Sequence, residues 1–250
     1  MNRPTTTKDC TSSPEDGNPL DTRFLNVALK IISTQRAAVT HLESYYQTND
    51  LARAALSASI DIIHLTFQNP DSQGKLIISG IGKSGKLGEK LAATFTSLGL
   101  QSCFLHPTDA LHGDLGIIQP KDAVLMLTSS GRTPELINLL PHIPRQIPII
   151  VLASCAKSSD CKISRLRPNS ILLPAPVHES EEVSIGIPVP TTTTVNAHAV
   201  GNSLAVAVSA RLYAERGKCV VGVFRSNHPG GAIGERLRSG LMAGSVRSRL

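Results

Sequence analysis

The chain is short of aromatic residues: among 250 residues it has no Trp, three Tyr and five Phe. A surface that stacks aromatic rings on nucleic-acid bases is therefore poorly supplied. Leu, Ile, Val and Ala must build the core, as they do in parallel sheets that helices cover on both faces. With 41% hydrophobic residues at this length, we predict a single domain with short tails.

Paired cysteines and long apolar runs are also lacking. The five cysteines form an odd set without a C-x-x-C pair, which fits neither a disulfide framework nor a structural zinc site. The N-terminal segment has no apolar stretch typical of a signal peptide, and no run of 18 apolar residues occurs. We therefore expect a cytoplasmic protein that needs no membrane contact, and we assign it no cofactor and no metal ligand. His106, His112 and Asp114 could in principle hold a metal ion, but nothing in the sequence fixes their mutual distance, so the need for a metal stays open.

The net charge of +6 is only a modest excess of basic residues. Its arginines are scattered, or gathered near the C-terminus without forming one dense run: Arg225, Arg236, Arg238, Arg247 and Arg249. Such a distribution suits a small anionic ligand and does not require a nucleic acid.

The order of apolar patterns divides the chain. Residues 1–22 are rich in Thr, Ser, Pro and Asp and are predicted to be a disordered tail. The domain is predicted over residues 23–240, with a C-terminal tail over residues 241–250. Helical spacing of apolar residues predicts two helices, Phe24–Tyr46 and Leu51–Phe67, before the first strand.

Apolar runs of strand length then alternate with helical stretches. The predicted strands are Lys75–Ser79, Gln101–Leu105, Ala123–Leu127, Ile147–Leu152 and Ser170–Leu173. The predicted helices are Ser84–Leu98, Pro134–Leu140, a short one over Ser158–Arg165, and Thr192–Glu215, which Gly217 ends. Because parallel strands need crossover connections, this alternation predicts an α/β fold, a three-layer sandwich with a parallel sheet between helices.

The first predicted strand runs into Gly80–Gly85, whose glycines allow three interpretations. A Walker A phosphate loop would need its first glycine at position 77, which is Ile77, so nucleotide hydrolysis is not indicated. A dinucleotide-binding G-x-G-x-x-G fingerprint does match. However, His106 and Pro107 stand where an acidic residue should close the second strand, and Asp109 comes late.

The third interpretation is a turn that binds a monophosphate or a sugar. Lys83, Ser84 and the amide groups at the start of the following helix would all meet such an anion. The simpler alternative is a Gly-rich turn that leaves Lys83 in solvent.

A second anion-seeking loop, Thr128–Thr133, follows the third predicted strand. It precedes Pro134, which is tolerated in a first helical turn because amide groups there lack intrahelical partners. Taken alone, a Ser/Thr cluster of this kind is more often only a helix N-cap. Both loops follow strands, however, and in a parallel sheet both lie at the carboxyl edge, where ligands bind.

Four segments follow one another in a definite order: Gly80–Gly85 (GIGKSG), Ala110–Gly116 (ALHGDLG) after His106-Pro107, Ser130–Glu135 (SGRTPE) and His228–Gly234 (HPGGAIG). Over residues 25–240 the chain thereby resembles the arabinose-5-phosphate isomerase branch of the SIS (sugar isomerase) family. The resemblance implies a five-stranded parallel sheet of the flavodoxin-like type, surrounded by helices. It also implies a homo-oligomer, usually a tetramer, with its sites at subunit contacts.

The resemblance assigns site residues by position. Phosphate or sugar contacts fall on Gly82, Ser84, Thr128, Ser130, Thr133, Thr191 and Thr192, with Thr193 and Thr194 at the same helix start. The catalytic set is Lys83, His112, Glu135, Glu182 and His228. Glu182 stands beside other carboxylates, Glu179 and Glu181, so an acidic loop in solvent is the plainer alternative for it.

Aldose–ketose isomerisation explains why these residue types would occur together. A proton moves between neighbouring carbons through an enediol, which needs a base and a donor to the carbonyl oxygen. Glu135 or Glu182 could be the base, and Lys83 the donor. His112 or His228 could open the sugar ring or shuttle a hydroxyl proton. We predict this activity on a sugar phosphate; the alternative is a phosphosugar-binding regulatory protein without catalysis.

Two features depart from this branch. Its bacterial members usually continue into a pair of CBS modules, whereas this chain stops soon after Gly234, so we expect no regulation of that kind. Arg132 stands where the branch often has an acidic residue. This reversed charge beside the phosphate loop leaves the identity of the sugar open.

Overall fold

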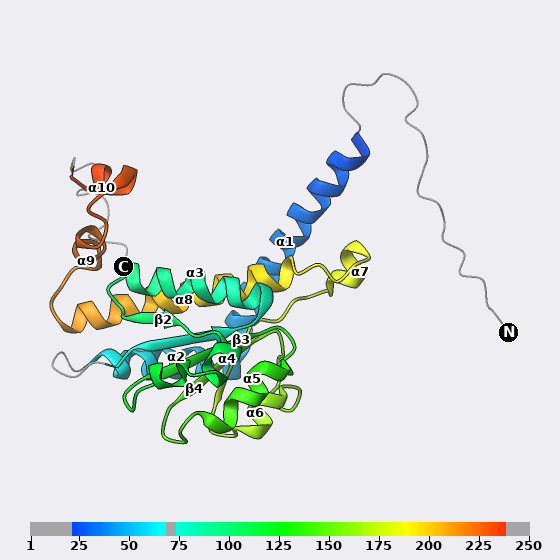
Figure 1. The fold of residues 1–250 in the computed structure, drawn as a ribbon. Coiled ribbons are helices and arrows are strands. Elements are labelled where there is room, and N and C mark those ends of the chain that lie inside the picture. The colour runs from blue at the N-terminus through cyan, green and yellow to red at the C-terminus, as the bar shows by residue number, and fades with distance from the viewer. Residues whose placement is uncertain (1–21, 69–73, 239–250) are drawn as a thin grey trace.

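The computed structural model describes residues 22–68 and 74–238. The predicted tails, 1–22 and 241–250, lie outside these residues apart from Thr22, which opens the first helix. The described part forms an α/β fold in three layers, with a sheet between two sets of helices (Figure 1). The predicted fold class is therefore confirmed.

Five parallel strands form the sheet in the order β2-β1-β3-β4-β5. They are β1 (Leu76–Gly80), β2 (Ser102–Phe104), β3 (Ala123–Thr128), β4 (Ile149–Ala153) and β5 (Ile171–Pro174). Each strand overlaps one of the predicted strands. Continuous apolar runs were enough to predict these strands. Because helices cover both faces of the sheet, strand side chains are buried whichever face they point to.

Most helices cover one face of the sheet or the other. On one side of the sheet lie α1 (Thr22–Thr48), α2 (Asp50–Gln68), α3 (Gly82–Ser97) and α8 (Thr192–Glu215). On the other side lie α4 (Pro107–Leu111), α5 (Pro134–Leu139) and α6 (Lys162–Leu166). The remaining helices are α7 (Glu181–Ile185), α9 (Val220–Ser226) and α10 (Gly231–Arg238), and 3-10 turns occur at Asp114–Ile117 and Leu140–His142. The predicted helices are confirmed, except that α6 starts later because Ser158–Asp160 form a turn.

The core is divided by the sheet into two apolar clusters. Along β3, Leu125 and Leu127 belong to the cluster beneath α2, α3 and α8. Val124 and Met126 alternate with them and belong to the cluster beneath α4, α5 and α6. Successive side chains of a strand point to opposite faces, so one short strand anchors both layers of helices.

The sheet reverses its order at β1. β1 lies beside β3, and Gly80 at its end is in register with Leu127. From β1 the chain first passes through α3 to β2 on one side, and then through α4 to β3 on the other. The loops after β1 and β3 therefore open on the same crevice, which is where α/β sheets hold their ligands.

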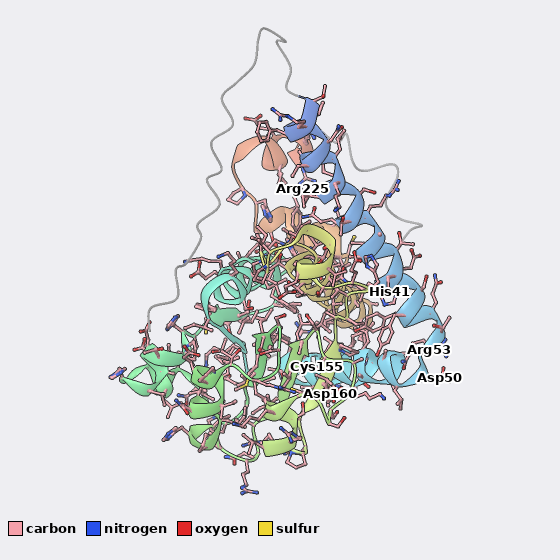
Figure 2. All side chains as sticks on the ribbon, turned by 90° about the vertical axis from the view of Figure 1, so that its right-hand side faces the viewer. His41, Asp50, Arg53, Cys155, Asp160 and Arg225 are labelled. Atoms are coloured by element: carbon pink, nitrogen blue, oxygen red, sulfur yellow. The ribbon has the colours of Figure 1, made fainter. Side chains whose placement is uncertain are left out.

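Two segments extend from this body. The first turns of α1 rise away from it, as Figures 1 and 2 both show. They expose an apolar face that consists of Phe24, Leu25, Val27, Leu29 and Ile32. At the other end of the molecule, α9 and α10 follow the end of α8. Within the described residues, no helix combines the length and the apolar content needed to cross a membrane.

Candidate active site

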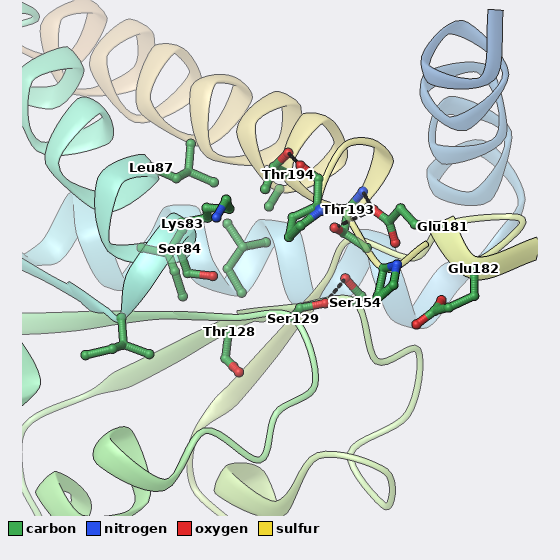
Figure 3. Close-up of a pocket in the computed structure, with 16 residues that line it drawn as sticks. Lys83, Ser84, Leu87, Thr128, Ser129, Ser154, Glu181, Glu182, Thr193 and Thr194 are labelled. Carbon is green, nitrogen blue, oxygen red and sulfur yellow. Dashed lines mark hydrogen bonds between the residues drawn. The ribbon is translucent and has the colours of Figure 1, made fainter. Parts of the chain in front are cut away.

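A cavity of about 340 Å³ opens at the carboxyl edge of the sheet, where the strand order reverses. Its walls come from the start of α3, the ends of β3 and β4, and the segment that leads from α7 into α8 (Figure 3). The polar lining residues are Lys83, Ser84, Thr128, Ser129, Ser154, Glu181, Glu182, Thr193 and Thr194. Segments that are far apart in the sequence therefore meet around one small space.

The turn between β1 and α3 supplies Lys83 and Ser84. Gly82 has a φ of +59°, a left-handed conformation that glycine adopts without strain, and α3 begins there directly after β1. The turn is tight, because a Cβ on Gly80 would stand 3.0 Å from the backbone of Ser84. Lys83 and Ser84 are thus fixed in the first turn of α3, where unpaired amide groups and the helix dipole favour an anion.

The loop after β3 forms the floor of the cavity and is held by its own hydroxyl groups. The Thr128 and Thr133 Oγ1 atoms are 2.7 Å apart, and the amide of Gly131 donates to Thr128 Oγ1 over 3.1 Å. The amide of Arg132 donates to Ser130 Oγ over 3.2 Å. Thr128 and its neighbour Ser129 line the cavity, whereas Ser130 and Thr133 stabilise the loop behind them.

The third wall is the start of α8, which a buried carboxylate caps. Glu181 is 7% exposed, and its Oε1 atom accepts four hydrogen bonds. The donors are the amides of Thr191 and Thr193 and the hydroxyls of Thr192 and Thr193, at 2.7–3.2 Å. Burial alone would raise the pKa of Glu181, but the hydrogen bonds from Thr193 and Thr191 lower it below its usual value.

This cap changes what the predicted threonines can do. The Thr191 amide and the Thr192 hydroxyl are directed to Glu181, so neither is offered to a ligand. Thr193 and Thr194 line the cavity. The Thr193 amide and hydroxyl also donate to Glu181, and the Thr194 hydroxyl donates to backbone carbonyls of Pro190 and Thr191. Figure 3 shows Lys83 and Ser84 on one side of the space and Glu181 and Glu182 on the other.

The predicted catalytic residues are only partly brought together. Lys83 and Glu182 line the cavity, and the Glu182 side chain is exposed. Glu135 lies in the first turn of α5, just after the β3 loop, and His112 ends α4. Both belong to segments that leave the same edge of the sheet, but neither is part of the lining.

His228 lies at the far end of the molecule. Its neighbour Asn227 donates from Nδ2 to the carbonyl of Ser97, the last residue of α3, over 3.2 Å. The His228 ring stacks on Phe224 with 4.0 Å between ring centroids, and its Nδ1 is 2.8 Å from the Phe224 carbonyl oxygen. Lys83 is at the other end of α3, about 20 Å away at 1.5 Å per residue. Within one chain His228 therefore cannot reach the cavity.

Some lining residues had not been predicted as site residues. These include Glu181, the neighbour of Glu182, and Ser129, which lies in the predicted loop after the third strand. Ser154 follows β4, so the rule that ligands bind at the carboxyl ends of parallel strands would have found it. Among the described residues, no group of three or more His, Cys, Asp or Glu side chains is placed to hold a metal ion.

The fold and the cavity define an α/β domain with a cavity of small-ligand size at the point where its parallel sheet reverses order. A model of the SIS domain matches residues 71–208. The chain belongs to the SIS domain family.

Curated relatives agree with this assignment. The arabinose 5-phosphate isomerase KdsD of Escherichia coli O6:H1 is 38% identical over 167 residues, which are 66% of this chain and 47% of the relative. KdsD of Yersinia pestis is 33% identical over 216 residues, 86% of this chain and 58% of the relative. The chain thus spans about half the length of the curated relatives it matches.

Solved structures show the same fold. The protein c3406 of E. coli CFT073, in complex with arabinose 5-phosphate, superposes with a TM-score of 0.63 at 26% identity, over 77% of this chain and 93% of that one. A putative sugar-phosphate isomerase from Listeria monocytogenes superposes with a TM-score of 0.65 at 24% identity, over 85% of this chain and all of that one.

Proposed function

We propose that the chain is a sugar-phosphate isomerase that interconverts an aldose and a ketose of the arabinose 5-phosphate and ribulose 5-phosphate kind through an enediol. The observation that carries this proposal is that Lys83, Ser84 and Thr128 line one cavity together with two carboxylates. The KdsD relatives carry the name of this activity, and the related E. coli protein holds arabinose 5-phosphate. A volume of about 340 Å³ lies within the range of small-ligand sites and suits a pentose phosphate.

The phosphoryl group belongs at the start of α3. Ser84, Thr128 and Ser129 offer hydroxyl groups there, and Gly82 leaves the first amide groups of the helix open. The proposed phosphate set also includes Ser130 and Thr133, which stabilise the β3 loop through the bonds described above. The sugar then extends towards the α7–α8 segment.

Proton transfer falls to Glu182 and Lys83. Glu182 would remove the proton from the carbon next to the carbonyl group and return it to the neighbouring carbon, while Lys83 donates to the oxygen that becomes negative in the enediol. Glu181 is less suited to this work, because a carboxylate that accepts four hydrogen bonds holds a proton weakly. Glu135 and His112 stay in the proposed catalytic set as residues of the same sheet edge.

A second copy of the chain would supply His228. Support comes from the distance of His228 from Lys83 and from apolar surface without cover in one chain: the exposed face of α1, and Val183 and Ile187 beside the cavity. Exposed apolar area of this kind marks contact surfaces. We propose a homo-oligomer, a tetramer as in the branch the chain resembles. Its cysteines at positions 103, 155, 161 and 219 are free, which suits a cytoplasmic setting.

The test is an assay on a panel of pentose and hexose phosphates. We expect the purified protein to give the same equilibrium mixture whether the reaction starts from arabinose 5-phosphate or from ribulose 5-phosphate. Glu182→Gln should lower kcat at least about 100-fold with little effect on stability, since this side chain is exposed and makes none of the capping bonds. Stabilisation by the sugar phosphates without turnover would contradict the proposal and favour a non-catalytic binding protein.

A further inference from the structure

A second, larger cavity lies at the opposite edge of the sheet. It has a volume of about 1010 Å³, and its walls come mainly from the segments that precede β4 and β5, around residues 137–145 and 166–169. In a parallel sheet the segments before the strands lie at the amino edge, whereas the first cavity is at the carboxyl edge. The two spaces are therefore separate.

The lining of the amino-edge cavity carries positive charge and no negative charge. Arg145, Arg167 and His142 line it, and none of its lining residues is Asp or Glu. Arg145 is exposed, and within the described part of the chain its side chain has no hydrogen-bond or ion-pair partner. A cation in this position is free to meet a ligand.

Arg167 is fixed in the wall. It is 8% exposed, and its guanidinium group donates to the carbonyl oxygens of Ile143, Pro144 and Ile147 over 2.7–3.2 Å. These carbonyls orient the group without neutralising it, and its buried Nε has no partner among the described residues. Burial and the nearby charge of Arg145 both lower the pKa of Arg167. A buried cation beside a second cation, with no carboxylate in the lining, is costly until an anion joins it.

Much of the rest of the wall is apolar, although Asn138 and Asn169 also line the cavity. Ile137, Leu140 and Leu166 line the cavity, and Leu166 is 54% exposed although it is large and hydrophobic. We propose that this cavity is a second binding site, which takes a small organic anion with its phosphoryl or carboxylate group at Arg145 and Arg167 and an apolar body against Ile137, Leu140 and Leu166. The two arginines would bind the anionic group of such a ligand, and the apolar side chains would pack against its body.

The test measures binding by calorimetry on the full chain, with three probes. AMP has both halves of the ligand, because its adenine ring presents a flat face that can pack on apolar side chains. Inorganic phosphate has only the charge, and adenosine has only the body with this ring. We expect AMP to bind more tightly than either of the others. Arg145→Gln should weaken AMP binding at least about tenfold, because it removes a charge-assisted bond. Leu166→Asn should weaken the binding of AMP but not that of phosphate.

Two control variants test whether AMP binds in this cavity and not elsewhere on the protein. Arg165→Gln removes an exposed charge from the same helix as Leu166, outside the lining, and Lys83→Ala removes the cation of the first cavity; both should leave AMP binding within about twofold of wild type. Unchanged melting temperatures will show that Arg145→Gln and Leu166→Asn fold. If neither AMP nor phosphate binds at millimolar concentration, or if Arg145→Gln binds AMP as wild type does, the site does not exist. Since no turnover is measured, this outcome is independent of the isomerase proposal.

Discussion

Two neighbouring carboxylates in this protein have opposite surroundings. Glu181 is buried and caps α8 through four hydrogen bonds, whereas Glu182 is exposed and lines the cavity without any of them. The first therefore positions the wall of the site, and the second is free to accept a proton.

The cap makes part of the stability depend on pH. The folded-state pKa of Glu181 is lowered, so its stabilisation is present above the unfolded pKa of about 4.3 and is lost as the pH falls through the lower folded value. We expect Glu181→Gln to lower the free energy of unfolding at pH 7 by about 1–3 kcal/mol. Urea unfolding from pH 7 down to pH 3 should show this difference shrinking as the pH falls. A difference that stays constant over this range would mean that the charge of Glu181 does not stabilise the helix start.

Some residues of the candidate site could be predicted from the sequence, and others could not. Lys83 and Ser84 come within four residues of the end of β1, and Thr128 is the last residue of β3. The predicted strands were therefore enough to place these three residues at the correct edge of the sheet. Glu181 and Glu182 open the short helix α7 between proline-containing segments, and which of them faces inward depends on the path of the chain through these segments. No spacing rule for strands or helices describes such a path.

At the scale of elements, the loop between β3 and α5 is held from below by the segment before α6. Gly131 has a φ of +66°, and a Cβ at this position would stand 2.7 Å from Cys161 Sγ and 3.0 Å from its Cα. The Gly131 carbonyl also accepts the amide of Ile163 over 3.1 Å. The hydroxyl-bearing loop is therefore seated on α6 through a residue without a side chain.

We expect Gly131→Ala to disturb both the stability and the site. Backbone strain and the clash with Cys161 should cost about 1–3 kcal/mol, and displacement of Thr128 and Ser129 should raise KM for the sugar phosphate. Gly222→Ala is the matched control, because Gly222 is helical and a Cβ there meets nothing within 4 Å. Chemical denaturation and steady-state kinetics measure the two effects. Equal behaviour of the two variants would show that the loop tolerates a side chain here.

Most elements were predictable, but several short helices were not. The strands and α8 carry apolar patterns of adequate length, and α8 has the predicted bounds, Thr192–Glu215. α4, α7 and α9 have only five to seven residues. Less than two helical turns cannot show a repeat of 3.6 residues, so tertiary contacts decide such segments.

At the scale of the whole molecule, the proposed site is incomplete in one chain. His228 follows α9, and Figure 2 shows Arg225 of that helix well away from Cys155, which follows β4. A motif such as His-Pro-Gly-Gly can be recognised in the sequence, but its distance from Lys83 depends on the course of α8 and α9.

A mixing experiment tests whether a second copy completes the site. Lys83→Ala and His228→Ala should each be nearly inactive alone. When the two variants are unfolded together, refolded and assembled at random, about a quarter of the sites would combine an intact Lys83 with an intact His228 from another chain. We therefore expect activity to return to that fraction of wild type. A mixture as inactive as its components, although mixed oligomers form, would remove His228 from the site.

The two cavities lie at opposite edges of one sheet, and this separation has a kinetic consequence. A compound in the amino-edge cavity would not compete with the sugar phosphate for space, so any effect it has on kcat would persist at saturating substrate. If the compound changes the affinity of the protein for the substrate by some factor, the substrate must change the affinity for the compound by the same factor.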